Sequence, residues 1–451
     1  MAKDIASLST ADKSALLAAL VGAGMSAASS YTVDFFGDSQ AGENSNANQY
    51  RAVGRGTQGI ALSKGRFRFG RNLGVGGQTT TQVRARLNDV LTSPNGIVSF
   101  ACGGNDLPLI ANGTQSIQIT IDNYKAMLDA ILATGKRVNV DAIPPRTQAA
   151  LTSGGLSSAQ AVIAAKVREG LNRWLAQYVY AKSPTQVVFT SYDAALIDRT
   201  TTNGEPQAGF VRDGIHATPL GATTAGAVWL ASMSAFAPPA TLGALSQSDI
   251  ADATYNPGGA MNVNPLLIGT AGTASGGVTG TVPTSFSANR ESGTTATAVA
   301  STDGSSLTLT LGGATGGAAS ERLRVQGDTV NAGANTFAPG DVVFMEVFID
   351  QANLVNVQSI NLLLRANDGT TQSDILSFLN GGGVTEREAP NASRRLISLP
   401  YTIPAYSGSG TQRVTPYVKI DVAADGAGAS GTITIRGLAV RKIPAGTTGL
   451  A

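Results

Sequence analysis

The chain has 451 residues, with 32 lysines and arginines, 30 aspartates and glutamates and a formal net charge of +2. This balance, without any long basic run, argues against nucleic-acid binding, which needs a basic stripe to neutralise phosphates. Charged residues make up only 14% of the chain, against ~25% in ordinary soluble domains, and there are 54 glycines. We therefore expect a surface of small polar residues and no nucleic-acid partner.

The chain contains a single cysteine, Cys102, and a single histidine, His216. One cysteine cannot form an intramolecular disulfide, and with one histidine the chain can hardly build the ligand set of a catalytic zinc site. We therefore predict neither a metal nor a cofactor. Any chemistry that needs an imidazole must use His216.

The longest apolar stretch, Ala15–Ala28, lies near the amino terminus. It is shorter than the ~20 residues that a membrane-spanning helix needs, so we predict no membrane span. A signal peptide is the alternative, but Asp4 and Asp12 stand where such a peptide is basic. We expect residues 1–30 to form an amphipathic helical segment instead.

Residues 31–240 alternate short apolar runs with segments of helical period, which is the pattern of an α/β sheet. We expect helices over Ile121–Thr134, ending before Gly135, over Ala159–Ala181, and after Pro219. The predicted strands are Thr32–Phe36, Phe67–Leu73, Ile97–Ala101, Arg137–Ile143 and Gln186–Ser191.

The helical period disappears beyond residue 240. Residues 241–281 are rich in small residues and proline, as in a linker with a first strand that leads into the next domain. Residues 282–451 carry short alternating runs separated by turn residues, which predicts a β-sandwich. The predicted strands are Ser306–Leu311, Arg322–Gln326, Val342–Ile349, Ile360–Leu364, Val414–Val422 and Thr432–Ile435.

Polar residues that could carry chemistry follow the predicted strands of the α/β part. Ser39 comes directly after the first strand, where parallel sheets place their ligand sites. Asp213 precedes His216 by three residues in a turn, so its carboxylate can accept from Nδ1–H and leave Nε2 for a serine hydroxyl. These residue types fit acyl transfer through an activated serine.

Two further segments could supply hydrogen bonds to an oxyanion. A glycine turn, Gly74–Gly77, follows the second strand, and Asn105 follows the third. Backbone N–H groups and an asparagine amide can both donate to developing negative charge. Taken alone, the glycine segment is better explained as a tight strand-to-helix turn. We expect Asp106 to hydrogen-bond within its own loop.

The order Gly-Asp-Ser, glycine turn, Gly-x-Asn-Asp and Asp-x-x-His resembles the SGNH hydrolases, also called GDSL esterases and lipases. The resemblance covers about Tyr31–Phe236 and all four motifs of the family. It implies a flavodoxin-like three-layer α/β/α domain that hydrolyses esters through an acyl-serine intermediate.

The resemblance also implies a role for each motif residue. Ser39 would be the nucleophile and first oxyanion-hole donor, with Gly77 and Asn105 as the other two donors. His216 would be the general base, oriented by Asp213. The neighbouring Gly76 could take the place of Gly77.

The substrate is a further inference. The loops Gln40–Ser63 and Thr147–Leu156 are polar and lack the long apolar stripe of an acyl-chain tunnel. This favours a short acyl group on a polar scaffold, such as acetyl on a cell-surface polysaccharide.

The segment Asn264–Ser287 resembles the first strand of jelly-roll carbohydrate-binding-like modules beside hydrolases in phage tail proteins. It implies a virion or extracellular location, tail proteins as partners and a possible trimer. No tryptophan follows Trp229, so a strong stacking platform for sugars is not evident. The tyrosines that could contact sugar, or simply pack, are Tyr401, Tyr406 and Tyr417.

Two alternatives stay open at this point. The α/β domain could be a degenerate hydrolase kept as a non-catalytic structural or receptor-binding component of a virion. The protein could also be a secreted lipolytic enzyme, which would prefer long acyl chains.

Overall fold

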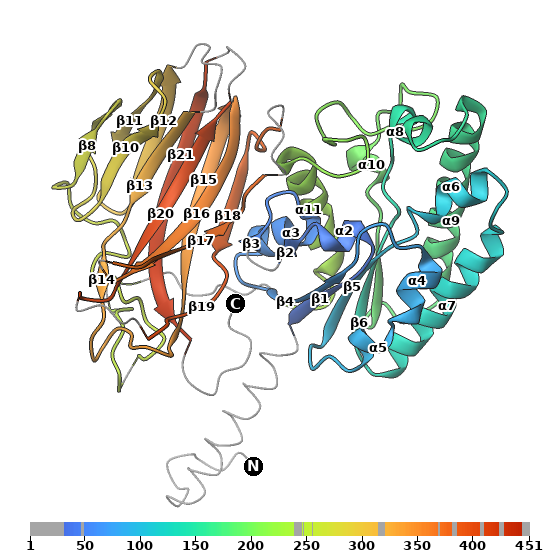
Figure 1. The fold of residues 1–451 in the computed structure, drawn as a ribbon, viewed down its shortest axis with the longest axis horizontal. Helices are drawn as coiled ribbons and strands as arrows, with labels where there is room; N and C mark the ends of the chain where they lie inside the picture. Colours follow the sequence, from blue (N-terminus) through green and yellow to red (C-terminus); the bar gives the residue numbers. More distant parts are fainter. Residues whose placement is uncertain are drawn as a thin grey trace, which may run out of the picture.

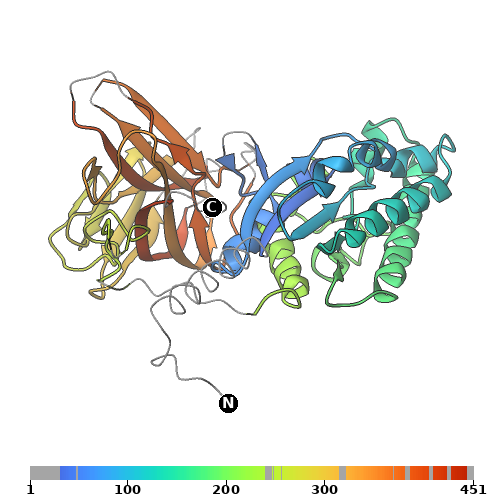
Figure 2. The ribbon, with the colours of Figure 1, turned by 90° about the horizontal axis from the view of Figure 1, so that it is seen from below.

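The computed structural model describes residues 31–46, 49–238, 246, 248–254, 256–313, 321–368, 370–380, 386–405, 410–423 and 428–443. The helix predicted within residues 1–30 lies outside these ranges. Figures 1 and 2 show two parts side by side, an α/β part formed by the first half of the chain and a β part formed by the second. Among the described residues, no helix is long and apolar enough to cross a membrane.

The centre of the α/β part is a five-stranded sheet in which every pair of neighbours is parallel. Numbered along the chain, the spatial order is second, first, third, fourth, fifth, which is the flavodoxin-like arrangement. All five predicted strands are confirmed, with ends shifted by no more than a few residues. In spatial order they are β4 (Arg68–Gly74), β1 (Thr32–Gly37), β5 (Ile97–Ala101), β6 (Arg137–Asp141) and β7 (Val187–Thr190).

Helices cover both faces of this sheet, as Figure 1 shows, so the predicted three-layer α/β/α architecture is confirmed. Neighbouring residues of a strand point to opposite faces. Phe35 therefore packs toward Trp229, while Phe36 stacks on Phe100 on the other side. One face carries α3 (Arg55–Leu62) and α11 (Pro219–Met233). The other carries α4 (Thr80–Ala85), α5 (Asn88–Leu91), α7 (Ile117–Ala133) and α9 (Ser158–Tyr180).

The helix predicted from Ile121 begins four residues earlier. The Ser116 side chain accepts a hydrogen bond from the Gln118 N–H at 3.2 Å and so caps α7 at Ile117. Ile117 and Ile119 are 37% and 45% exposed, so they lie off the apolar face that marked the helix. The other end agrees with the prediction, because Gly135 adopts a φ of 81° just past the helix. The shorter elements are α2 (Ser39–Gly42), β2 (Ser45–Asn46), β3 (Gln49–Tyr50), α6 (Asp106–Ala111), α8 (Gln148–Ser153) and α10 (Asp193–Leu196).

The described residues of the second half form two seven-stranded sheets, consistent with the predicted β-sandwich. Along β11 the side chains alternate strictly between buried and exposed, as expected when one sheet face is covered. The first sheet contains β8 (Thr273–Ser275), β10 (Ser287–Ser292), β13 (Glu321–Gln326), β14 (Val330–Asn331), β16 (Val357–Asn367), β17 (Gln372–Ser377) and β20 (Arg413–Val422). The second contains β9 (Val278–Gly280), β11 (Ala296–Ser301), β12 (Leu307–Gly313), β15 (Val342–Val355), β18 (Ala392–Ile397), β19 (Tyr401–Thr402) and β21 (Ser430–Lys442). A jelly-roll topology remains a prediction.

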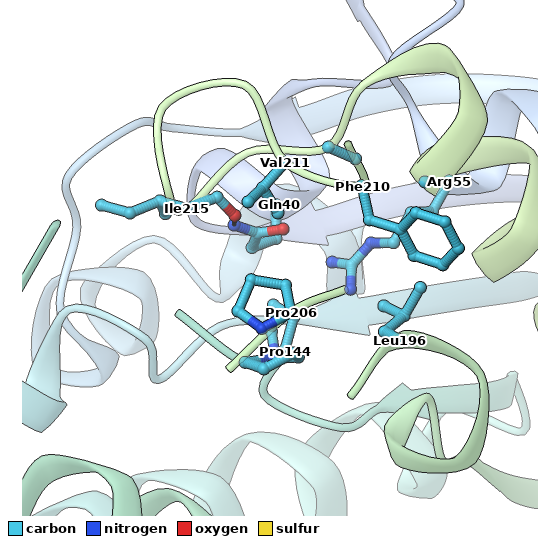
Figure 3. A pocket seen from close by; sticks show the side chains of 11 residues that line it. Gln40, Arg55, Pro144, Leu196, Pro206, Phe210, Val211 and Ile215 are labelled. Atoms are coloured by element: carbon cyan, nitrogen blue, oxygen red, sulfur yellow. Dashed lines mark hydrogen bonds between the residues drawn. The ribbon is translucent and has the colours of Figure 1, made fainter. Parts of the chain in front are cut away.

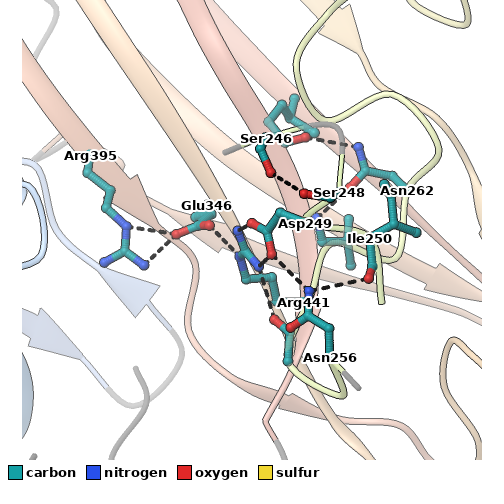
Figure 4. Close-up of polar contacts among 12 residues, drawn as sticks. Ser246, Ser248, Asp249, Ile250, Asn256, Asn262, Glu346, Arg395 and Arg441 are labelled. Carbon is teal, nitrogen blue, oxygen red and sulfur yellow. Dashed lines mark hydrogen bonds and ion pairs between the residues drawn. The ribbon is translucent and has the colours of Figure 1, made fainter. Parts of the chain in front are cut away.

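Part of the predicted linker is attached to this second half. Arg441 of β21 pairs with Asp249 at 2.6 Å and also contacts Glu346 of β15, which Arg395 of β18 reaches from the other side, as Figure 4 shows. Further along, β8 and β9 pair in parallel with β10 and β11. The predicted boundaries at residues 240 and 281 remain predictions.

The predicted tyrosine contacts have different surroundings. Tyr417 is buried, and the guanidinium groups of Arg324 and Arg365 each lie 5.4 Å from its ring centre, so its faces are used within the protein. Tyr401 packs partly buried against the hydrophobic core. Tyr406 lies outside the described residues.

Candidate active site

Ser39 lies at the carboxyl end of β1. Strand β1 is flanked by β4 and β5, and the chain order of the sheet reverses there. The close turn requires glycine at position 37, because a Cβ there would lie 1.7 Å from the Ala101 carbonyl oxygen. Asp38 then caps α2 by accepting a hydrogen bond from the Gln40 N–H at 2.9 Å. Ser39 is the first residue of α2, so its N–H has no acceptor within the helix. This N–H can serve as a hydrogen-bond donor to a ligand.

His216 contacts both Ser39 and Asp213. Its Nδ1 lies 2.7 Å from a carboxylate oxygen of Asp213, and its Nε2 lies 2.9 Å from the Ser39 Oγ. A carboxylate only accepts hydrogen bonds, so Nδ1 carries the proton and Nε2 is left to accept from the serine hydroxyl. The structure therefore brings the three predicted residues into one hydrogen-bonded chain.

The Asp213 carboxylate is held by the turn that contains it. Its Oδ1 accepts the N–H groups of Ile215 at 2.9 Å and His216 at 2.7 Å, and Gly214 supplies the φ of 80° that the turn needs. Burial alone would raise the pKa of Asp213, but the hydrogen bonds from His216 and Ile215 bring it down to about 2. The carboxylate is thus ionised throughout the neutral range and stabilises a protonated imidazole beside it.

The loop that carries His216 is tied to the helix that carries Ser39. Arg212 donates to the Glu43 carboxylate at 2.7 Å, and Glu43 is the C-cap residue of α2. Arg51 donates to the same Glu43 oxygen at 2.8 Å. The far side of the loop is fixed by the Thr147 N–H, which donates to the Gly214 carbonyl at 2.9 Å. These contacts fix the position of His216 relative to Ser39.

The predicted oxyanion-hole segments lie against each other. The Asn105 amide Nδ2 donates to the Gln78 carbonyl at 3.0 Å, next to Gly77, which has a φ of 78°. A Cβ at Gly76 would lie 3.9 Å from the Cβ of Ser39, whereas one at Gly77 would have no neighbour within 4 Å. The glycine turn therefore passes Ser39 with Asn105 beside it, and the choice between Gly76 and Gly77 as donor stays open.

The Asp106 carboxylate is hydrogen-bonded outside its own loop, whereas the sequence context predicted bonds within that loop. It accepts from the Thr80 N–H at 2.9 Å and the Thr80 hydroxyl at 2.6 Å, and it also accepts from Gln115 and Thr120. The prediction failed for the carboxylate because Thr80 at the start of α4 and Thr120 of α7 supply donors to it from distant parts of the sequence. Asp106 joins the two oxyanion-hole segments.

Sequence reasoning missed Arg146, whose guanidinium donates to the Asn105 side-chain oxygen at 3.3 Å. This bond turns the Asn105 nitrogen away from Arg146 and so fixes which end of the amide is free to donate. A signal was present, because Arg146 follows the predicted strand Arg137–Ile143 at the edge where Ser39 and Asn105 lie.

Asp38 was also missed as a titratable group. It is buried, and one of its oxygens has no hydrogen-bond partner among the described residues. Burial raises the pKa of Asp38 to about 6, against the opposing effects of the Gln40 N–H and the charges of Arg146 and Arg55. The residue that precedes Ser39 in the chain therefore carries a buried carboxyl group that is costly to ionise.

Two spaces lie beside the loop that carries His216. A cavity of about 20 Å³, shown in Figure 3, is lined by Gln40, Ile215 and Arg55, among others, and has room for little more than one water-sized group. An open groove of about 470 Å³ runs beside Asp213 and is lined mainly by small and polar residues such as Thr147 and Gln207. Neither space is a long apolar channel.

Comparisons with known proteins agree with this geometry. Residues 35–223 match the model of the GDSL-like Lipase/Acylhydrolase family. The match supports a GDSL-like lipase/acylhydrolase domain in this part of the chain and indicates an ester hydrolase.

Solved structures similar to this part include a GDSL-like lipase from Bacteroides thetaiotaomicron, 18% identical, covering 46% of this chain and 88% of that chain with a TM-score of 0.34. A lipase/acylhydrolase from Enterococcus faecalis is 20% identical, covering 47% of this chain and 98% of that chain with a TM-score of 0.35. No curated protein sequence matches the chain.

Proposed function

We propose that the chain is a serine esterase that removes short acyl groups, in particular O-acetyl groups on a cell-surface polysaccharide, through an acyl-serine intermediate. The observation that carries the proposal is the contact of His216 with both Asp213 and Ser39 at hydrogen-bond distance. A serine hydroxyl is a weak nucleophile at neutral pH, and such a base is what activates it.

In the first step, the Ser39 oxygen attacks the ester carbonyl carbon while Nε2 of His216 takes the hydroxyl proton. The negative charge moves to the carbonyl oxygen, where N–H donors from Ser39, the glycine turn and the Asn105 amide stabilise it. When the C–O bond to the alcohol breaks, His216 returns the proton to the leaving oxygen. The acyl group is then bound to Ser39 as an ester.

In the second step, water replaces the alcohol. His216 takes a proton from water as the water oxygen attacks the acyl carbon, and it returns that proton to Ser39 as the acid leaves. Asp213 stays ionised throughout and stabilises the imidazolium formed in both steps. The side chains described here complete the cycle, with water as the only co-reactant.

The two spaces beside the catalytic loop support a short acyl group on a polar alcohol. The 20 Å³ cavity is too small for a long chain, and the 470 Å³ groove beside Asp213 offers small and polar side chains such as Thr147 and Ser153. We propose that the groove, which Asp213 and Gly214 line, holds the part of a polar alcohol that lies away from the reacting ester. A sugar hydroxyl is an alcohol of this kind.

For the second half of the chain we propose a role in binding the acylated glycan or in attaching the enzyme to a phage tail, with a trimer as the assembly to test. Its resemblance to modules beside phage tail hydrolases supports this. It also supports a virion or extracellular location. Size-exclusion chromatography with light scattering measures the trimer directly, and a monomer at micromolar concentration contradicts it.

Acetate release from acetylated polysaccharide tests the proposal, with Ser39→Ala as the inactive variant and Ser234→Ala as the matched control. Ser234 is exposed and hydrogen-bonds the carbonyl of Ala231 at the end of α11. We expect release by wild type and Ser234→Ala only. Equal inactivity of wild type and Ser39→Ala on acetylated glycans and on p-nitrophenyl acetate would favour a non-catalytic virion protein. A clear preference for octanoyl over acetyl esters would favour a lipolytic enzyme.

A further inference from the structure

We propose that the β-sandwich braces the active site. Arg394 and Gln58 would be positioning residues that hold the segments carrying Ser39 and His216 in place relative to each other. The inference rests on the proposed function, because it concerns the geometry of that same catalytic pair. Figure 1 shows β18 of the sandwich beside α3 of the hydrolase domain.

The sandwich forms backbone hydrogen bonds with both catalytic segments. Phe378 N–H donates to the Tyr50 carbonyl at 2.7 Å, and Ala52 N–H donates to the Leu379 carbonyl at 2.9 Å, so the chain between α2 and α3 is held. Leu220 N–H donates to the Arg387 carbonyl at 2.9 Å. Leu220 is in the first turn of α11, directly after the His216 loop. The sandwich thus contacts the chain shortly after each catalytic residue.

A buried side-chain bond lies at the centre of this contact. Arg394 is 2% exposed, and its guanidinium donates to the Gln58 side-chain oxygen at 2.8 Å and to Glu388 at 2.9 Å. Gln58 is fully buried on α3, and its amide donates to the Ala52 carbonyl at 2.7 Å. Because buried polar groups are costly to leave unpaired, this network fixes α3 against β18.

Helix α3 transmits that position to both catalytic residues. A Cβ at Gly56 would lie 1.9 Å from the ring of Phe35 on β1, the strand that ends at Ser39. A Cβ at Gly226 of α11 would lie 2.8 Å from the Gly59 nitrogen. The backbone of α3 is therefore in direct contact with both β1 and α11. A shift of Gln58 moves α3 between the two elements that hold Ser39 and His216.

Two variants weaken the brace without touching the catalytic groups. Gln58→Leu removes the bond from Arg394 and the bond to the Ala52 carbonyl, and it keeps the bonds of Arg394 to Glu388 and Gln351. Arg394→Lys keeps the positive charge beside Glu388 but cannot reach Gln58 and Glu388 with the same fork of donors. The matched control is Arg322→Gln, which breaks an ion pair with Asp421 within the sandwich.

The measurements are kcat and KM for p-nitrophenyl acetate on the full chain. Displacing a reacting group by a fraction of an ångström acts on kcat, so we expect both brace variants to lose about tenfold or more in kcat with KM within about twofold. Arg322→Gln should keep wild-type kcat even if its midpoint of thermal unfolding falls. Wild-type kcat in folded Gln58→Leu, or in Arg394→Lys if Gln58→Leu does not fold, overturns the brace.

Hydrogen exchange gives a second readout that does not depend on activity. We expect faster amide exchange in peptides covering residues 49–62 and 212–223 of Gln58→Leu, and no change there in Arg322→Gln. Unchanged amide exchange in Gln58→Leu contradicts the brace even if the enzyme assay detects no activity in any of the proteins. An active wild type with an inactive Ser39→Ala, together with unaffected brace variants, would leave the proposed function standing and reject the brace alone.

Discussion

The Nε2 atom of His216 lies 2.9 Å from the Oγ atom of Ser39, although 177 residues of sequence separate the two. The parallel sheet makes this possible, because β1 delivers Ser39 to the same edge that the loop before α11 crosses. The ion pair between Arg212 and Glu43 then connects that loop to α2. The contact that we propose to be catalytic is therefore supported by Arg212 and Glu43, which are not part of it.

Replacing Asp213 with asparagine should lower kcat by about 10³- to 10⁴-fold, as expected when the orienting carboxylate of a catalytic histidine is lost. KM should change little. Because the pKa of Asp213 is about 2, the carboxylate stays ionised above about pH 3, so the acid side of the wild-type pH profile should not report its titration. Steady-state kinetics from pH 4 to 9 measures both effects. A variant within tenfold of wild type would contradict the role of Asp213.

Asn105→Ala should lose about 10²- to 10³-fold in kcat, the usual cost of removing one oxyanion-hole donor. Asn112→Ala is the control, since Asn112 is exposed at the end of the same helix, α6. Arg146→Met should lose less, because the Asn105 amide remains and only its orientation is freed. Equal kcat in Asn105→Ala and Asn112→Ala would remove Asn105 from the site.

The Arg212–Glu43 ion pair should couple to catalysis. Arg212→Gln and Glu43→Gln should each lower kcat/KM, and the double variant should lose less than the product of the two. Neighbouring groups in one network typically couple by about 0.5–3 kcal/mol, and we expect an interaction free energy in this range from the double-mutant cycle. Strict additivity would show that the pair does not position His216.

Asp38 should make the protein less stable as pH rises through the acidic range. Its folded-state pKa of about 6 lies above the ordinary value of 3.8, so its contribution to stability is complete below pH 3.8 and is lost as pH rises through 6. The difference corresponds to about 3 kcal/mol. The unfolding free energy of Asp38→Asn minus that of wild type, both measured in urea, should therefore increase between pH 4 and pH 7. Parallel curves for the two proteins would contradict the shifted pKa.

The elements that carry chemistry were predictable because they lie where strong local signals coincide. Strands β1, β5 and β7 are short apolar runs. Ser39, Asn105 and the Asp213–His216 turn follow directly on strands or precede a capped helix. Because the sequence contains a single histidine, only His216 could be proposed as an imidazole base. In the sandwich, β15 and β16 were predicted in the right place but too short, since the missed ends carry polar residues such as Gln351, Gln358 and Ser359, which interrupt the apolar alternation.

Other features could not be predicted because they depend on contacts between distant segments. The strand β10, with the sequence Ser-Ala-Asn-Arg-Glu-Ser, lacks an apolar alternation and is held by pairing with β13 and β8. The bond between Arg394 and Gln58 joins residues 336 positions apart, and nothing local to either residue signals the other. Arg146 stood at the right sheet edge, but its partner is an amide oxygen whose orientation only the structure shows.

Covalent labelling of the nucleophile is the most direct test of the central claim, that His216 activates Ser39. The protein is treated with a p-nitrophenyl phosphonate ester, which phosphonylates an activated serine, and the modified peptide is mapped by mass spectrometry. We predict one label per chain, on Ser39. The labelling rate should fall steeply in His216→Gln, and Ser39→Ala should stay unlabelled. A label on another residue, or equal labelling of wild type and His216→Gln, would contradict the account.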